Sequence, residues 1–90
     1  MNYKKLFIVK SDSALPENNF NHFQVVGIFT TQKRAEACVV ANFNINKGNT
    51  LVKDPMRHTV YNYTYMTSEE TPRLVYHRDI IEEHYLNRQY

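Results

Sequence analysis

This sequence contains very little cysteine, glycine or tryptophan. Its 90 residues include one cysteine, Cys38, two glycines and no tryptophan. A lone cysteine cannot form an internal disulfide, on which small secreted domains usually depend, so we expect a reducing, cytoplasmic environment. Gly27 and Gly48 alone do not make a glycine-rich phosphate loop. Long apolar runs are also missing, so we expect no membrane-spanning segment and no membrane partner.

The apolar run near the N-terminus, Leu6 to Val9, ends at Lys10. It is shorter than the core of a signal peptide, which needs about 7–15 apolar residues. Overall, 42% of the residues are apolar and 22% are charged, which is typical of a folded globular domain. The formal charge of +2 does not select a partner class. Abundant asparagine and tyrosine with scarce glycine and tryptophan indicate AT-rich codons, as in a bacteriophage or a low-GC bacterium.

The hydrophobic pattern predicts a single α+β domain over residues 1–90. The expected elements are a strand at 3–9, a loop at 11–21, a strand at 22–30, a helix from 32 to 42 or 43, a strand at 57–66 and a short edge strand at 74–76. The first two strands most simply pair antiparallel, and Gly27 permits a bulge or a close backbone approach. We therefore expect a small, mostly antiparallel sheet of three to five strands packed against one main helix.

The predicted helix has start and stop signals. Thr30 or Thr31 can accept a hydrogen bond from the free N–H groups of the first turn. Gly48 or a neighbouring asparagine suits a left-handed helix end. The stripe expected to pack on the sheet has helical spacing and consists of Ala35, Cys38, Val39 and Asn42, extended by Phe43.

The final stretch, residues 79–87, is ambiguous. Ile81 and Tyr85 suit one face of a helix, and periodicity alone slightly favours that reading over a closing strand.

A resemblance bears on this choice. Four segments carry it: the run from Leu6 to Val9, the segment Val25-Val26-Gly27-Ile28-Phe29-Thr30-Thr31, Ala35-Glu36-Ala37 and the stretch from Ile81 to Asn87. Together they resemble a class of small uncharacterised domains common in phages and bacteria. The resemblance covers about half of the chain and implies a closing strand, which we therefore expect. It brings no catalytic residues. The insert at 44–76, which sets this chain apart, is where we expect its particular function to lie.

Three tyrosines, Tyr61, Tyr63 and Tyr65, alternate along the predicted strand at 57–66 and so project from one face. The opposite face carries Asn62 and Thr64, which suit solvent. Core packing under the helix is the favoured interpretation, while a protein interface and stacking on nucleic-acid bases remain open.

Catalytic and metal chemistry find little support in the pattern. Cys38 falls on the helix stripe expected to be buried, where a thiol is inert. Asp79, Glu82 and Glu83 lie near His84, but we expect them to form a solvated face. The histidines show no metal-ligand spacing and are His22, His58, His77 and His84. We expect the protein to have no enzymatic activity, no metal site and no cofactor.

The expected function is that of a non-enzymatic binding protein, in the form of a phage accessory protein that inhibits a host or defence factor by binding it. The candidate contact residues form a basic and aromatic set, Lys47, Lys53, Arg57, Tyr61, Tyr63 and Tyr65. The alternative is a small nucleic-acid-binding module that uses the same segment, 47–65. A homodimer formed through an exposed strand edge is also left open.

Overall fold

A computed structural model describes residues 2–88 of the chain. Its elements are β1 (Asn2–Ala14), β2 (Gln24–Phe29), α1 (Gln32–Ile45), β3 (Val52–Lys53), β4 (Val60–Met66) and β5 (Leu74–Arg88). Within these residues the strands form one antiparallel sheet in the order β2-β1-β5-β4-β3. The predicted α+β class, with a small sheet and one helix, is confirmed.

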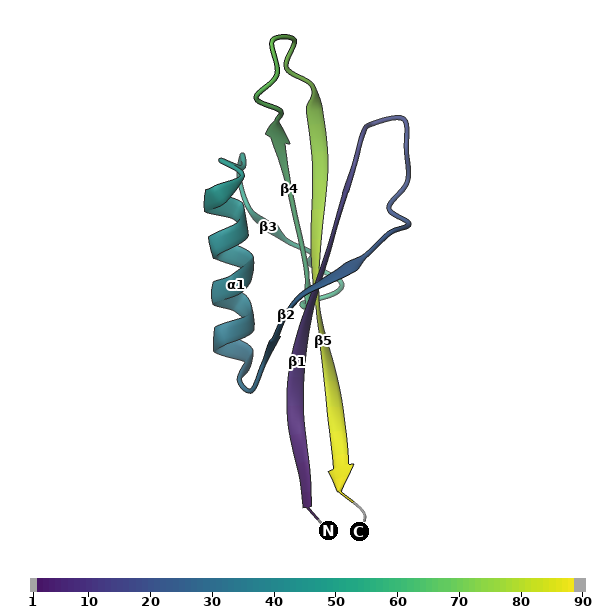
Figure 1. Ribbon diagram of the computed structural model, residues 1–90, viewed down its shortest axis with the longest axis vertical. Coiled ribbons are helices and arrows are strands. Elements are labelled where there is room, and N and C mark those ends of the chain that lie inside the picture. The colour runs from purple at the N-terminus through teal and green to yellow at the C-terminus, as the bar shows by residue number, and fades with distance from the viewer. Residues whose placement is uncertain (1, 89–90) are drawn as a thin grey trace.

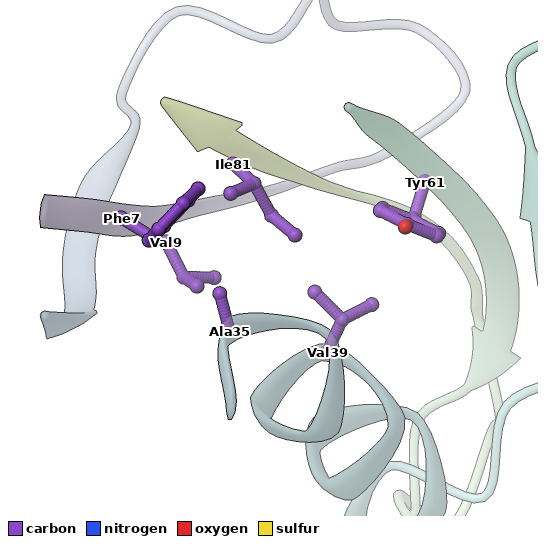
Figure 2. Packing of buried hydrophobic residues seen from close by; sticks show 6 residues of the cluster. All are labelled: Phe7, Val9, Ala35, Val39, Tyr61 and Ile81. Carbon is purple, nitrogen blue, oxygen red and sulfur yellow. The ribbon is translucent and has the colours of Figure 1, made fainter. Parts of the chain in front are cut away.

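The helix α1 lies along one face of the sheet, on the side where the core forms (Figure 1). Figure 2 shows side chains of β1, β4 and β5 converging on two small residues of α1. The buried cluster consists of Phe7, Val9, Ala35, Val39, Tyr61 and Ile81. Each large apolar side chain buried in this way stabilises the fold by about 1.5–3 kcal/mol. The expected helix stripe is confirmed for Ala35 and Val39, while Cys38 is only partly buried.

The long ribbon of β1 and β5 forms the centre of the sheet. These two strands pair continuously from Asn2 opposite Arg88 to Ala14 opposite Tyr76. They run past the end of α1, so the start of β1 and the end of β5 lie side by side at one tip of the sheet (Figure 1). The closing segment is thus a strand, as the resemblance implied, and the helical alternative is wrong.

Two predicted boundaries at this ribbon are wrong. The loop expected to begin at Ser11 begins only after Ala14, because the strand includes the four residues from Ser11 to Ala14. The short edge strand expected at 74–76 is the start of the central strand β5. The hydroxyl groups of Ser11 and Ser13 bond to side chains of β5 instead of to their own backbone, so these residues stay extended.

The second strand begins at Gln24, two residues later than predicted, and pairs antiparallel with β1 as expected. Its register shifts opposite Val9 and Lys10, next to Gly27. A Cβ atom on Gly27 would lie 2.5 Å from the ring of Phe29, so this ring occupies the space that a side chain at position 27 would need. Thr31 caps the helix, and its hydroxyl oxygen accepts the Arg34 N–H at 3.2 Å.

The helix ends in an αL turn, but Lys47 occupies the left-handed position instead of the glycine or asparagine expected there. Lys47 has φ 52°. The N–H of Gly48 donates to the carbonyl of Phe43 at 2.9 Å, and the N–H of Lys47 donates to that of Asn44 at 3.1 Å. These two bonds satisfy carbonyls that the helix leaves free.

Replacing Lys47 with glycine should stabilise the protein, because a Cβ atom in the left-handed region is unfavourable and glycine has none. We expect a gain of about 0.5–1 kcal/mol in the free energy of unfolding, measured by urea denaturation. The control is Lys47→Ala, which removes the same charge and keeps the Cβ atom. A glycine variant no more stable than the alanine variant would contradict this explanation of the turn.

The tyrosine strand β4 begins at Val60, three residues after the predicted start. The intervening residues form a turn in which the Asp54 carboxylate accepts the N–H groups of Met56 at 2.8 Å and Arg57 at 3.1 Å. These hydrogen bonds lower the pKa of the Asp54 carboxyl below its ordinary value. Side-chain bonds of this kind compete with strand pairing, which accounts for the later start.

Candidate functional site

The face of the sheet opposite α1, here called the open face, carries a group of exposed apolar side chains. Ile8 pairs with Ile28 of β2, and Lys10 pairs with Ile80 of β5 and with Val25 of β2. Cross-strand partners project from the same face, so these residues form one surface. Ile28 is 60% exposed and Val25 is 54% exposed. Within residues 2–88 no helix covers this face.

A hollow of about 600 Å³ lies on the same face, over β3, β4 and the start of β5. Its lining includes Phe20 from the loop after β1, Val52, Tyr76 and Arg78. The Arg78 Nε–H donates to the Asn62 side-chain oxygen at 2.8 Å, and the guanidinium carbon lies 4.7 Å from the centre of the Phe20 ring. This contact holds Arg78 across the floor of the hollow, while its guanidinium has further N–H donors.

Charged side chains cross the open face beside the apolar group. The Glu82 carboxylate lies 3.0 Å from the Lys10 ammonium and 3.1 Å from Nε2 of His84. Hydrogen bonds from His84 and then Lys10 lower the pKa of the Glu82 carboxyl. The face therefore combines an apolar centre with fixed charges, as many protein interfaces do.

The sequence-predicted tyrosines lie on the other face, beneath the helix. Tyr61 and Tyr63 are buried, and Tyr65 is partly buried. The Asn46 amide donates to the Tyr63 hydroxyl at 2.9 Å, yet burial raises the pKa of this hydroxyl to about 12. The Tyr63 ring packs edge-on against Phe43, with ring centres 5.0 Å apart. Two of the three rings thus pack in the core, which was the favoured interpretation.

The sequence-predicted basic residues do not gather around those rings as a group. The Lys53 ammonium lies 5.7 Å from the centre of the Tyr61 ring. Lys47 follows the helix, and Arg57 pairs with Asp54 across 3.6 Å in the turn before β4. All three cations are exposed. Lys53 thus lies against Tyr61 and Lys47 lines the same hollow as Tyr65, whereas Arg57 pairs with Asp54.

A second group of polar residues lies on the helix side of the sheet, where Ser11 pairs with Asp79 and Ser13 pairs with His77. Asp79 is 0% exposed, so the expectation that it belongs to a solvated face is wrong. One carboxylate oxygen accepts bonds from Ser11 and from Nε2 of His77, the latter at 2.9 Å. The other oxygen is buried and finds no hydrogen-bond partner in the part of the chain that the structure describes.

This polar group was not predicted from the sequence, because its residues come from two strands that are distant in the chain and form no contiguous catalytic motif. Ser11 with Ser13 and His77 with Asp79 are each two residues apart, so each pair projects from one face of its strand. This two-residue spacing within each strand was the sequence signal that could have indicated the polar group. Their meeting depends on the register of β1 with β5, which joins segments more than 60 residues apart.

No family model, curated protein or solved structure matches this chain. In residues 2–88, no three side chains among His, Cys, Asp and Glu gather closely enough to hold a metal ion. Burial raises the pKa of the Cys38 thiol, which disfavours its reactive thiolate. Within the same residues, no helix has both the length and the apolar character to cross a membrane.

Proposed function

We propose that this chain is a protein-binding module whose open face docks on a larger partner protein. The observation that carries the proposal is the exposure of Ile28 and Val25 on a sheet face that no helix covers within residues 2–88. Apolar side chains grouped in this way mark interaction surfaces more often than scattered ones do. The neighbouring hollow offers a site for one or more side chains of the partner.

The composition of the hollow favours a protein as the partner. Tyrosine and arginine dominate binding energy in protein interfaces, and Tyr76 and Arg78 both line it. Arg78 is held by Asn62 and Phe20 before any partner arrives, which lowers the entropy lost on binding. A carboxylate or a backbone carbonyl of the partner would suit the remaining guanidinium donors.

The nucleic-acid alternative is the weaker of the two proposals. It relied on tyrosine rings stacking on bases, and Tyr61 and Tyr63 are buried under α1. Exposed Lys47, Lys53 and Arg57 remain as contacts for phosphate groups. A protein partner fits the apolar centre of the open face better than a polyanion does.

The biological role we propose is inhibition by occupancy, in which the module covers a surface that its partner needs. The single cysteine favours action in a cytoplasm. The codon bias inferred from composition favours a phage accessory protein acting on a host or defence factor. This role requires no catalytic residues on the open face.

The experiment is affinity capture from a bacterial lysate, followed by titration of the purified candidate partner against matched variants. We expect Ile28→Glu, on the open face, to weaken binding about 30-fold or more, as loss of a hot-spot contact does. Val40→Glu is the control, because Val40 is a similarly exposed apolar residue on α1. It should leave the affinity within about twofold.

Two outcomes would reject the proposal. In one, Val40→Glu abolishes binding and Ile28→Glu does not. In the other, the chain captures only nucleic acid, with an affinity that falls steeply as salt is added.

A further inference from the structure

The polar group on the helix side forms a continuous chain of hydrogen bonds from an exposed serine to a buried carboxylate. Oγ of Ser13 lies 2.7 Å from Nδ1 of His77, and Nε2 of the same ring lies 2.9 Å from Oδ1 of Asp79. Ser13 is exposed, His77 is 7% exposed and Asp79 is fully buried. A serine, a histidine and an aspartate thus stand in the order that activates a serine nucleophile.

The neighbours of His77 select the tautomer that suits catalysis. Asp79 Oδ1 accepts from the Ser11 hydroxyl, and because a carboxylate has no proton to donate it also accepts from Nε2–H of His77. With its proton on Nε2, the neutral imidazole presents the free lone pair of Nδ1 to Ser13. The ring is reversed relative to serine proteases, where Nε2 faces the serine, but each nitrogen has an equivalent task.

We propose that Ser13 is a nucleophile, that His77 is its general base and that the substrate is a small polar ester. A cavity of about 310 Å³ opens beside Ser13 and His77. This volume is at the lower end of the range for small-molecule sites. Its lining is mostly polar and consists of Ser11, Asp12, Ser13, His22, Gln24, Val26 and His77.

The cavity has side chains that can stabilise charge on the substrate. Gln24 carries an amide that donates N–H bonds, and side-chain amides of this kind stabilise the oxyanion formed during acyl transfer. Asp12 is occupied, because its carboxylate accepts the N–H groups of Asn21 and His22 at 2.9 and 3.0 Å. These bonds also tie the loop after β1 against the cavity.

The chemical step is acyl transfer followed by hydrolysis. The Ser13 oxygen bonds to the ester carbonyl carbon as its hydroxyl proton passes to Nδ1 of His77. The bond from that carbon to the alcohol oxygen then breaks, and the departing alcohol takes the proton from His77. Water attacks the acyl-serine with His77 again accepting a proton. The bond to Ser13 breaks, the proton returns to its oxygen, and a carboxylic acid leaves.

The serine hydroxyl groups of this site lie on the side of the sheet away from the apolar group of the open face. Ser11 and Ser13 project from the side of β1 that carries Phe7 and Val9, whereas Ile8 and Lys10 project from the other side. His77 also lines the hollow over β4 and β5, so the two sites share this residue.

The test is labelling of the purified chain with an alkyl fluorophosphonate, read out by peptide mass spectrometry. A bond from phosphorus to Oγ forms, the P–F bond breaks, fluoride leaves and the hydroxyl proton passes through His77 to solvent. We expect one adduct, on Ser13, and none in Ser13→Ala. The control is Ser68→Ala, at an exposed serine outside the cavity, which should label at the wild-type rate.

Two further variants separate chemistry from folding. His77→Gln should slow labelling of Ser13 about 10²–10⁴-fold, the usual contribution of a general base. Val40→Glu, at an exposed residue of α1 that does not line the cavity, should label at the wild-type rate. If Ser13 in the wild-type protein reacts no faster than Ser68, or if Ser13→Ala labels as well as the wild type, the proposal is wrong.

Discussion

Replacing Asp79 with alanine is expected to lower the free energy of unfolding by about 2–5 kcal/mol, because two buried hydrogen-bond donors lose their acceptor. Asp79 is fully buried and accepts hydrogen bonds from Ser11 and His77. Without the carboxylate, both partners would be left in an environment with little access to water, where an unsatisfied polar group costs about 1–3 kcal/mol. The measurement is the urea midpoint and slope, followed by far-UV circular dichroism.

The matched control for this prediction is Glu83→Ala. Glu83 lies on the same strand and pairs with Lys5, but about half of its side chain is exposed. Exposed ion pairs contribute about 0–1 kcal/mol, so this variant should unfold close to the wild-type midpoint. Equal losses in the two variants would show that Asp79 is not held in a buried network.

Replacing Ile81 with alanine is expected to lower the free energy of unfolding by about 2–5 kcal/mol, the range for large-to-small changes in a packed core. Ile81 is 4% exposed and lies between the sheet and α1, in contact with the cluster of Val9 and Val39 (Figure 2). Because α1 is anchored mainly by this cluster, the cavity left by the alanine should also weaken the docking of the helix.

The neighbouring residue supplies a control of the same chemical type. Ile80 projects from the open face and is only partly buried. Its replacement by alanine should cost about 1 kcal/mol, because less apolar surface returns to water. If Ile80→Ala proves as destabilising as Ile81→Ala, something covers the open face in solution, and a second copy of the chain would be the first occupant to test.

The strands β1, β2 and β4 and the helix could be predicted because each carries a local signal, whereas the two-residue strand β3 was not predicted. These signals depend only on residues close together in the sequence. Examples are the apolar run from Leu6 to Val9, the threonine cap of the helix and the alternation around Tyr63. The ends of β1 and β5 could not be predicted in this way. They extend because Ser13 and His77 bond across the ribbon, and that contact exists only once the register of the two strands is set.

The closing segment shows the same limit. The spacing of Ile81 and Tyr85 fits a helix as well as a strand, and periodicity alone favoured the helix. Pairing with β1 makes this segment a strand, since Ile81 lies opposite Val9 in the centre of the sheet. Only the resemblance pointed to this outcome.

The candidate site could not be predicted from the sequence, because its position depends on which face of the sheet the helix covers. Leu6 to Val9 is apolar at every position, so its sequence does not say whether Phe7 or Ile8 faces the core. The tyrosines were conspicuous in sequence, yet Tyr61 and Tyr63 are part of that core. Three isoleucines were not predicted as contact residues, yet they lie together on the open face: Ile8, Ile28 and Ile80.

The central claim is that a partner protein docks on the open face, and methyl NMR of the complex tests it most directly. Adding the captured partner to the labelled chain should shift the methyl signals of Ile8, Ile28 and Ile80. The methyl signals of Val40 and Ile45, which are exposed on α1, should stay in place. Shifts confined to Val40 and Ile45, with Ile28 unchanged, would contradict the account.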